Sequence, residues 1–227
     1  MAIVLILLVI VVWNPFWKQL YLRQIDDTTA SVEFRKSAAL KLFQGYVSDA
    51  FAVFSERLSE TEANTRATAL YGMQLVAQDR INGIKPLERL IEELNKCDSG
   101  SNQPFVKTIA EICKVYQQPA RSESETQRDV ERLQLIAKTL IPLTESDQKP
   151  EIRLVCVETM QELSVPGVCR RMLKLASPEK GDLRDKALRG IVATALPDAV
   201  GDLLGVIASP DKLLAEEARR GFVVVRD

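Results

Sequence analysis

Apolar residues recur three and four positions apart from about residue 31 to the end of the chain, in segments separated by short polar breaks. This spacing places the apolar side chains on one face of an α-helix. No convincing run of alternating apolar and polar residues, the pattern typical of a strand, interrupts these segments. The pattern therefore predicts an all-α fold built from amphipathic helices.

The beginning of the chain follows a different pattern. Residues 2–12 are an unbroken run of Ala, Ile, Val and Leu, which continues through two tryptophans to Lys18. A helix over this run is about 25 Å long, and a helix that continues to Tyr21 reaches across a bilayer core of about 30 Å. We therefore expect a single hydrophobic transmembrane helix over residues 1–23, followed by a linker over residues 24–31.

Aromatic and basic residues follow the apolar run, as is typical of a membrane–water interface. The candidate membrane-interface residues are Trp13, Trp17, Lys18, Tyr21 and Arg23. The positive-inside tendency predicts a single-pass protein with its C-terminal part in the cytoplasm. A cleavable signal peptide is disfavoured, since the run lacks a basic start and a small-residue cleavage site. A docking helix inside a large assembly is an open alternative.

The C-terminal part repeats itself every 31 residues, and a fixed period is typical of stacked helical repeats. The equivalent positions are Ile152, Leu183 and Leu214, then Cys156, Ala187 and Ala218, and then Pro166 and Pro197. Near the start, Arg35 and Arg66 keep the same interval. Each unit is predicted to hold a first helix, a tight turn and a second helix, with the small residues allowing close helix approach.

Residues 151–156 and 182–190 each open with an acidic residue, an apolar residue and an arginine, followed by small residues. In this they resemble the HEAT-repeat family, in particular the short bacterial HEAT-like repeats of the phycobilin-lyase type. The resemblance implies an α-solenoid of about five HEAT-like hairpins over residues 32–227. It also implies a polar ladder between repeats, made by the opening arginines. The matching positions are Arg35, Arg66, Arg153 and Arg184.

Two parts of the predicted array depart from the regular pattern. Residues 96–150 form an irregular repeat, with a first helix opening near Phe105, a polar loop over 117–124 and a long second helix over 126–143. Residues 213–227 supply a single helix that is expected to act as a C-terminal cap.

The residue types that carry most chemistry are missing or scattered. The chain has no histidine, which excludes imidazole catalysis and imidazole–metal sites. Its four cysteines show no metal-ligand spacing, so unpaired thiols are expected, although a disulfide between Cys156 and Cys169 is open. No Gly-rich phosphate loop occurs. We therefore expect no enzyme activity, no cofactor, no metal and no small-molecule substrate.

Charge argues against a nucleic-acid partner, because 30 Lys and Arg residues nearly balance 31 Asp and Glu residues. Two local groups are candidate partner-binding surfaces instead: a basic patch of Arg170, Arg171 and Lys174, and an aromatic group containing Phe51 and Phe54. The alternatives are a solvated helix face for the basic patch and packing of the first repeat for the aromatic group.

Together these features predict a membrane-anchored HEAT-repeat scaffold or accessory subunit that binds protein partners in a membrane-associated complex. The likeness to phycobilin lyases suggests an alternative function, the handling of a chromophore or cofactor on the concave face of the solenoid. Because a scaffold does not transfer its function to other chains with the same repeats, protein binding is the favoured hypothesis.

Overall fold

The computed structural model describes residues 15–79, 84–97, 101–120, 122–177 and 179–226. Within these ranges the regular structure is α-helix with two short 3-10 turns, and no strand occurs. The all-α prediction is confirmed. Most of the predicted anchor over 1–23, including Trp13, lies outside the described residues.

The chain divides into two compact units, the first ending at Lys96 and the second beginning at Cys97. The single repeat array expected over 32–227 stays a prediction. The division falls where the 31-residue period breaks, at the start of the irregular repeat predicted over 96–150.

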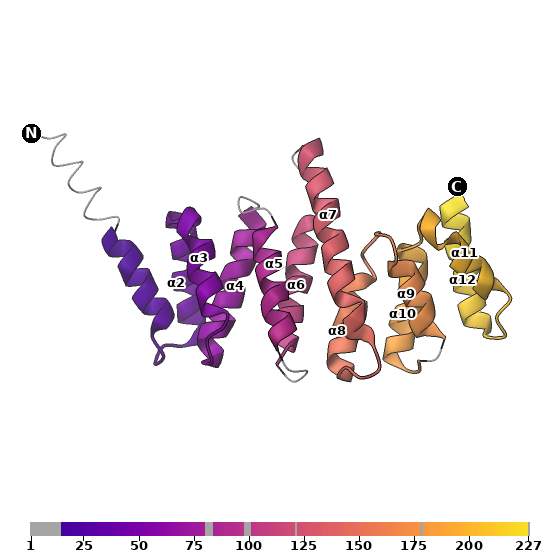
Figure 1. Ribbon diagram of the computed structural model, residues 1–227, viewed down its shortest axis with the longest axis horizontal. Helices are drawn as coiled ribbons and strands as arrows, with labels where there is room; N and C mark the ends of the chain where they lie inside the picture. Colours follow the sequence, from indigo (N-terminus) through magenta and orange to yellow (C-terminus); the bar gives the residue numbers. More distant parts are fainter. Residues whose placement is uncertain (1–14, 80–83, 98–100, 121, 178, 227) are drawn as a thin grey trace, which may run out of the picture. The chain divides into compact units, whose positions relative to one another are not determined.

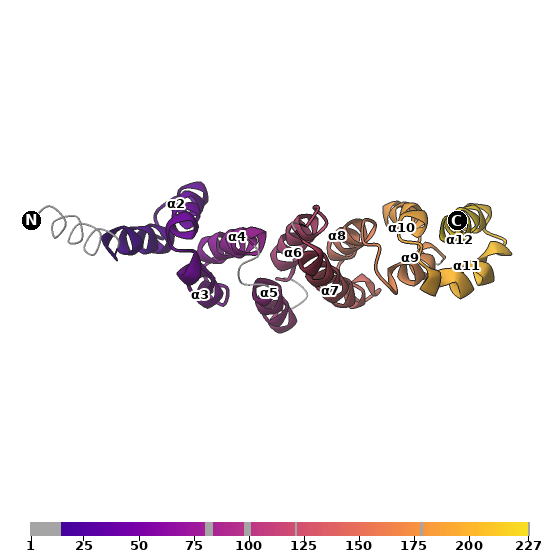
Figure 2. The same cartoon turned by 90° about the horizontal axis from the view of Figure 1, so that it is seen from above.

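The first unit is a two-layered group of helices. Residues 15–26 are helical and are followed by α2 (Val32–Gly45), α3 (Val47–Arg57), α4 (Ala63–Asp79) and α5 (Lys85–Lys96). Within this unit, α2 and α4 pack side by side in one layer, and α3 and α5 lie in the other (Figures 1 and 2).

Close helix packing in the first unit depends on one glycine. Phe54 of α3 is fully buried, and its ring lies so near Gly72 of α4 that a β-carbon at Gly72 would sit 2.4 Å from it. Phe54 therefore packs the first repeat, which is the alternative that the sequence left open for the aromatic group. A partner at this surface would not touch its ring.

The second unit holds helices α6 (Gln103–Tyr116), α7 (Glu123–Leu140), α8 (Pro150–Met160), α9 (Val168–Ala176), α10 (Asp182–Ala193), α11 (Val200–Ile207) and α12 (Lys212–Arg226). The first helices of the hairpins, α6, α8, α10 and α12, form one layer, and α7, α9 and α11 form the other (Figure 2). The irregular hairpin is α6 and α7, and the predicted cap is α12.

Residues that are 31 positions apart occupy equivalent places in successive hairpins. The small residues Cys156, Ala187 and Ala218 lie at the same place in α8, α10 and α12, and each is 0% exposed. At Gly190 and Gly221 an added β-carbon would lie only 3.1 Å and 3.3 Å from the side chains of neighbouring helices. These positions need small side chains because successive hairpins approach closely there.

Among the described helices, no single one is both long and apolar enough to cross a membrane. One pair, Asp182–Ala193 with Pro197–Ile207, passes that test together by length and composition and is bent by 119°.

Candidate functional site

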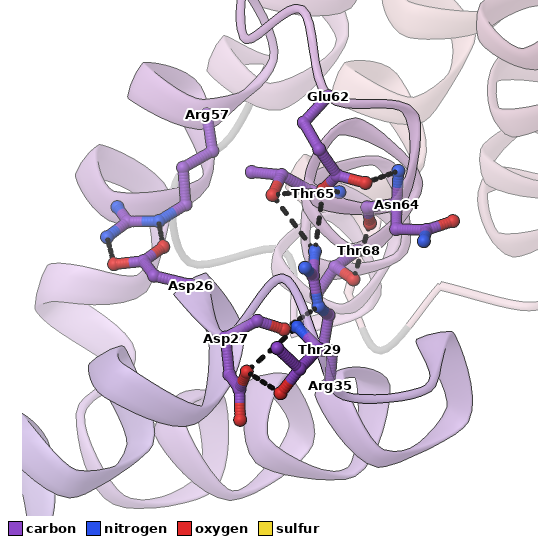
Figure 3. Close-up of polar contacts among 9 residues, drawn as sticks. All are labelled: Asp26, Asp27, Thr29, Arg35, Arg57, Glu62, Asn64, Thr65 and Thr68. Atoms are coloured by element: carbon purple, nitrogen blue, oxygen red, sulfur yellow. Dashed lines mark hydrogen bonds and ion pairs between the residues drawn. The ribbon is translucent and has the colours of Figure 1, made fainter.

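A buried arginine connects consecutive hairpins in the first unit (Figure 3). Arg35 of α2 is 0% exposed. Its Nε donates a hydrogen bond to the carbonyl oxygen of Asp27 at 2.7 Å, and its Nη1 donates to Glu62 Oε2 at 2.8 Å and to Thr65 Oγ1 at 2.9 Å. The guanidinium thus joins the segment before its own helix to the start of α4.

Glu62 performs a second role in the same contact. One of its carboxylate oxygens accepts the backbone N–H of Asn64 at 2.9 Å, and the other accepts that of Thr65 at 2.6 Å, so it caps the N-terminus of α4. Hydrogen bonds from Thr65 and Arg35 favour the charged form and lower the pKa of Glu62 to about 2. The side chain of Glu62 therefore fixes the start of one helix and holds the arginine of the preceding helix.

The second unit repeats this arrangement twice. Nε of Arg153 donates to the carbonyl oxygen of Thr144 at 3.0 Å, and its Nη2 pairs with Glu179. Nε of Arg184 donates to the carbonyl oxygen of Ala176 at 3.1 Å, and its Nη2 donates to Asp211 Oδ2 at 2.5 Å.

Asp211 also caps a helix, because its Oδ1 accepts the backbone N–H of Leu214 in the first turn of α12. This hydrogen bond and the pairing with Arg184 lower the pKa of Asp211. The predicted arginine ladder is confirmed for Arg35, Arg153 and Arg184. Arg66, at the fourth matching position, is half-buried and makes no such pair with another described residue.

The carboxylates of the ladder were not recognised in the sequence. Glu62 and Asp211 each follow their arginine by 27 residues, and Glu179 follows its arginine by 26. An acidic residue at this interval, just before the next first helix, is the signal that would have identified them.

The helical residues 15–26 are joined to α3 by charged contacts at both of their ends. Lys18 Nζ lies 2.5 Å from Asp49 Oδ2. Near the other end, Arg57 donates from Nε and Nη2 to the two carboxylate oxygens of Asp26, each at 2.7 Å, and this raises the pKa of Arg57 (Figure 3).

The predicted membrane-interface residues of this segment occupy different environments. Lys18 is engaged by Asp49, whereas Arg23 is exposed. Trp17 and Tyr21 are half-buried, and their rings stack with centroids 6.0 Å apart. Contact with lipid head groups stays a prediction for all of them.

The predicted basic patch on α9 is largely engaged within the protein. Nε of Arg170 donates to Asp202 Oδ2 at 2.7 Å, which raises the pKa of Arg170. Arg171 turns toward the preceding hairpin, where its Nε donates to Thr144 Oγ1 at 2.6 Å and its Nη1 lies 2.9 Å from Glu145. The two arginines therefore connect hairpins in opposite directions, and Lys174 is exposed beside them.

A groove that the sequence did not reveal lies between α6 and α8. It has a volume of about 580 Å³. Apolar side chains of Ala110, Cys113 and Val155 line it together with Thr159 and Gln117. Its charged rim consists of Lys107, Glu111 and Lys114 from α6, Glu158 from α8 and Glu162 from the turn that follows α8.

Several rim charges of this groove already have partners. Lys114 Nζ lies 2.7 Å from Glu111 Oε1, which raises the pKa of Lys114, and Glu158 pairs with Lys186 of α10 at 2.6 Å. Lys107 and Glu162 are exposed and make no ion pair with another described residue. They are the charges of the groove that are available to a ligand.

Cys156 and Cys169 form no disulfide, so the pairing left open by the sequence does not occur. Burial raises the pKa of Cys113 and Cys156 to about 12 and that of Cys169 to about 11. Over the described ranges, no group of three or more acidic or cysteine side chains is placed to hold a metal ion.

Comparisons with solved structures identify the fold. An engineered protein matches with a TM-score of 0.56 at 16% identity, over 92% of this chain and 96% of the other. A designed armadillo repeat protein matches with a TM-score of 0.51 at 16% identity, over 91% of this chain and 98% of the other. No protein-family model and no curated protein matches the sequence.

These likenesses show an armadillo-type helical repeat fold, which confirms the predicted class of fold. They do not distinguish the HEAT type within it, so that finer assignment stays a prediction. Neither of the two matched proteins bears on chromophore handling, which also stays a prediction.

Proposed function

We propose that this chain is a membrane-attached scaffold that binds a partner protein in the groove between α6 and α8, and that it is not an enzyme. The observation that carries the proposal is this groove in an armadillo-type repeat fold, with a partly apolar lining and two exposed charges that make no ion pair with another described residue. Helical repeat folds present such extended surfaces to other proteins.

The partner segment that fits this groove best is an amphipathic helix. Lys107 lies on α6 and Gln117 directly follows its last residue, and their ten-position separation is about 15 Å along a helix. Gln117 Nε2 donates to the carbonyl oxygen of Glu162 at 2.9 Å, so Glu162 lies near the far end of the groove from Lys107. A partner helix with apolar side chains between the rims, an acidic residue near Lys107 and a basic residue near Glu162 matches both lining and charge.

Membrane attachment rests on the sequence of residues 2–12, whose apolar run suits a bilayer. The positive-inside tendency favours a cytoplasmic location for the repeat array. The proposed complex is therefore one that assembles at the membrane surface.

The proposal is tested by purifying the tagged full-length chain from its native membranes in mild detergent. Quantitative mass spectrometry then measures which proteins accompany it and at what ratio. The proposal expects one partner at a fixed ratio. Lys107→Glu should lower the recovery of the partner about tenfold, because the new carboxylate would repel the acidic residue that the partner places near Lys107.

The matched control is Lys138→Glu, which makes the same change in charge at an exposed position of α7. Partner recovery with this variant should equal that of the unmodified chain. Equal losses with both variants would show that charge in general, and not the groove, governs binding. A chain recovered without any partner at a fixed ratio would contradict the scaffold function.

A further inference from the structure

The helical residues 15–26 occupy the position of a second helix one repeat ahead of α3. Two contacts define this position: Lys18 with Asp49, and Asp26 with Arg57. In both, the partners are 31 residues apart, which is the repeat period. Because the two contacts are eight residues apart with the same offset, the two helices run parallel and in register over about 12 Å.

Residues 15–26 are held in the first unit by a buried side chain as well as by ion pairs with α3. Ile25, which directly precedes Asp26, is 0% exposed, so this end of the helix is packed within the protein. The contact of Asp26 with Arg57 is bidentate, and Arg57 Nη1 also donates to the carbonyl oxygen of Val53 at 3.0 Å. A bidentate guanidinium–carboxylate pair fixes direction as well as distance. The segment therefore moves as part of the first unit.

Aromatic rings line the end of this helix that adjoins the apolar run. The ring centroids of Phe16 and Trp17 are 5.7 Å apart, and those of Trp17 and Tyr21 are 6.0 Å apart. Phe16 is 59% exposed. Aromatic residues of this kind prefer the head-group layer of a bilayer. The apolar run of residues 2–12 lies directly ahead of them in the sequence.

We propose that residues 15–26 are a rigid mount that holds the first unit against a phospholipid bilayer in one orientation. Phe16, Trp17 and Tyr21 lie in the head-group layer, while Lys18 and Asp26 bind the protein and not the lipid. This proposal rests on the proposed membrane attachment. It adds that residues 24–26 of the linker predicted over 24–31 belong to this helix, which is held against α3.

A rigid mount differs from a flexible tether in what it does to the first unit. With a tether, the unit samples many orientations and distances from the bilayer. With a mount, the same face of the unit always points to the membrane, so that a partner in the membrane meets a fixed surface. Loss of orientational freedom lowers the entropic cost of binding such a partner.

The experiment uses the full-length chain in phosphatidylcholine vesicles that contain a minor share of phosphatidylglycerol. Trp13→Phe leaves Trp17 as the only tryptophan, since the chain has two. Quenching of its fluorescence by lipids brominated at different depths reports where Trp17 lies. We expect the strongest quenching from bromine near the head groups.

The second readout is the orientation of the first unit. A donor dye is placed at Gly45→Cys, an exposed site with no atom within 4 Å of an added β-carbon, in a Cys97→Ser background. Time-resolved energy transfer to labelled lipid head groups gives the distribution of distances from the bilayer. We expect a narrow distribution, which broadens when Asp26→Asn and Asp49→Asn are combined.

The control is Glu33→Gln, which removes an exposed ion pair with Lys36 within α2. It should leave both readouts unchanged, and circular dichroism checks that each variant keeps its helix content. Absence of Trp17 quenching in the starting chain would overturn membrane attachment itself. Two results would overturn the rigid mount alone, provided that Trp17 is still quenched. One is a broad distribution of distances from the bilayer before Asp26 and Asp49 are replaced, and the other is a distribution that stays narrow after both are replaced.

Discussion

Replacing Arg35 by alanine should destabilise its own unit more than the same change at Arg153 or Arg184 destabilises the second unit. The side chain is 0% exposed, whereas those of Arg153 and Arg184 are 12% and 22% exposed. Arg35→Ala removes three hydrogen bonds, to Asp27, Glu62 and Thr65. At about 1 kcal/mol for each, and somewhat more where a charge takes part, the free energy of local unfolding should fall by roughly 3 kcal/mol.

Hydrogen–deuterium exchange followed by mass spectrometry measures this loss in the first unit directly. Exchange of the core amides in α2 and α4 should accelerate by roughly a hundredfold, because about 1.4 kcal/mol corresponds to a factor of ten. The matched control is Arg66→Ala, at the same position of the next repeat, where the arginine makes no such pair with another described residue. Its effect should stay below roughly fivefold.

The comparison of these two arginines decides whether the ladder stabilises the repeats. If Arg35→Ala and Arg66→Ala accelerate exchange equally, the hydrogen bonds of Arg35 do not contribute, and burial of arginine stems explains the pattern. If neither has an effect, the contact holds no appreciable free energy.

Three further predictions follow from the geometry. The pKa of Glu62 falls on folding from 4.5 to about 2, so the carboxylate should stabilise the fold fully above pH 4.5 and lose this effect as the pH drops toward 2. Denaturant titrations across this pH range should show a smaller acid-induced loss in the free energy of unfolding for Glu62→Gln than for the unmodified chain. Gly72→Ala forces a β-carbon into the Phe54 ring and should cost about 1–3 kcal/mol in denaturant unfolding, whereas Gly45→Ala, in open space, should cost nothing or stabilise slightly. Iodoacetamide at mildly alkaline pH should modify half-buried Cys97 first, as seen by mass spectrometry of the intact chain, and should react slowly with Cys113, Cys156 and Cys169; comparable rates at all four thiols would contradict their burial.

The repeat could be read from the sequence because close helix packing restricts residue type. Cys156, Ala187 and Ala218 are fully buried between closely packed helices, so the period is visible as a recurring small residue. The ladder arginines were predicted from the resemblance to HEAT repeats, and Arg66 shows that the matching position alone does not ensure the contact.

The position of residues 15–26 could not be read in this way. Their register with α3 depends on two ion pairs, Lys18 with Asp49 and Asp26 with Arg57. The residues of each pair are one period apart but carry opposite charges, so a search for similar residues at that interval does not find them. The groove between α6 and α8 was also hidden, because it depends on the distance between two helices across an irregular connection. The basic residues on α9 drew attention as a patch, yet their opposite directions appear only in three dimensions.

The most direct test of the scaffold function is site-specific photo-cross-linking in native membranes. A benzoylphenylalanine at Thr159, within the groove, is compared with one at Gln134, exposed on α7. We predict that the Thr159 probe forms an adduct with one partner protein, mapped by mass spectrometry to an amphipathic helix, and that the Gln134 probe does not. Adducts of equal yield at both sites, or none at Thr159, would contradict binding in the groove.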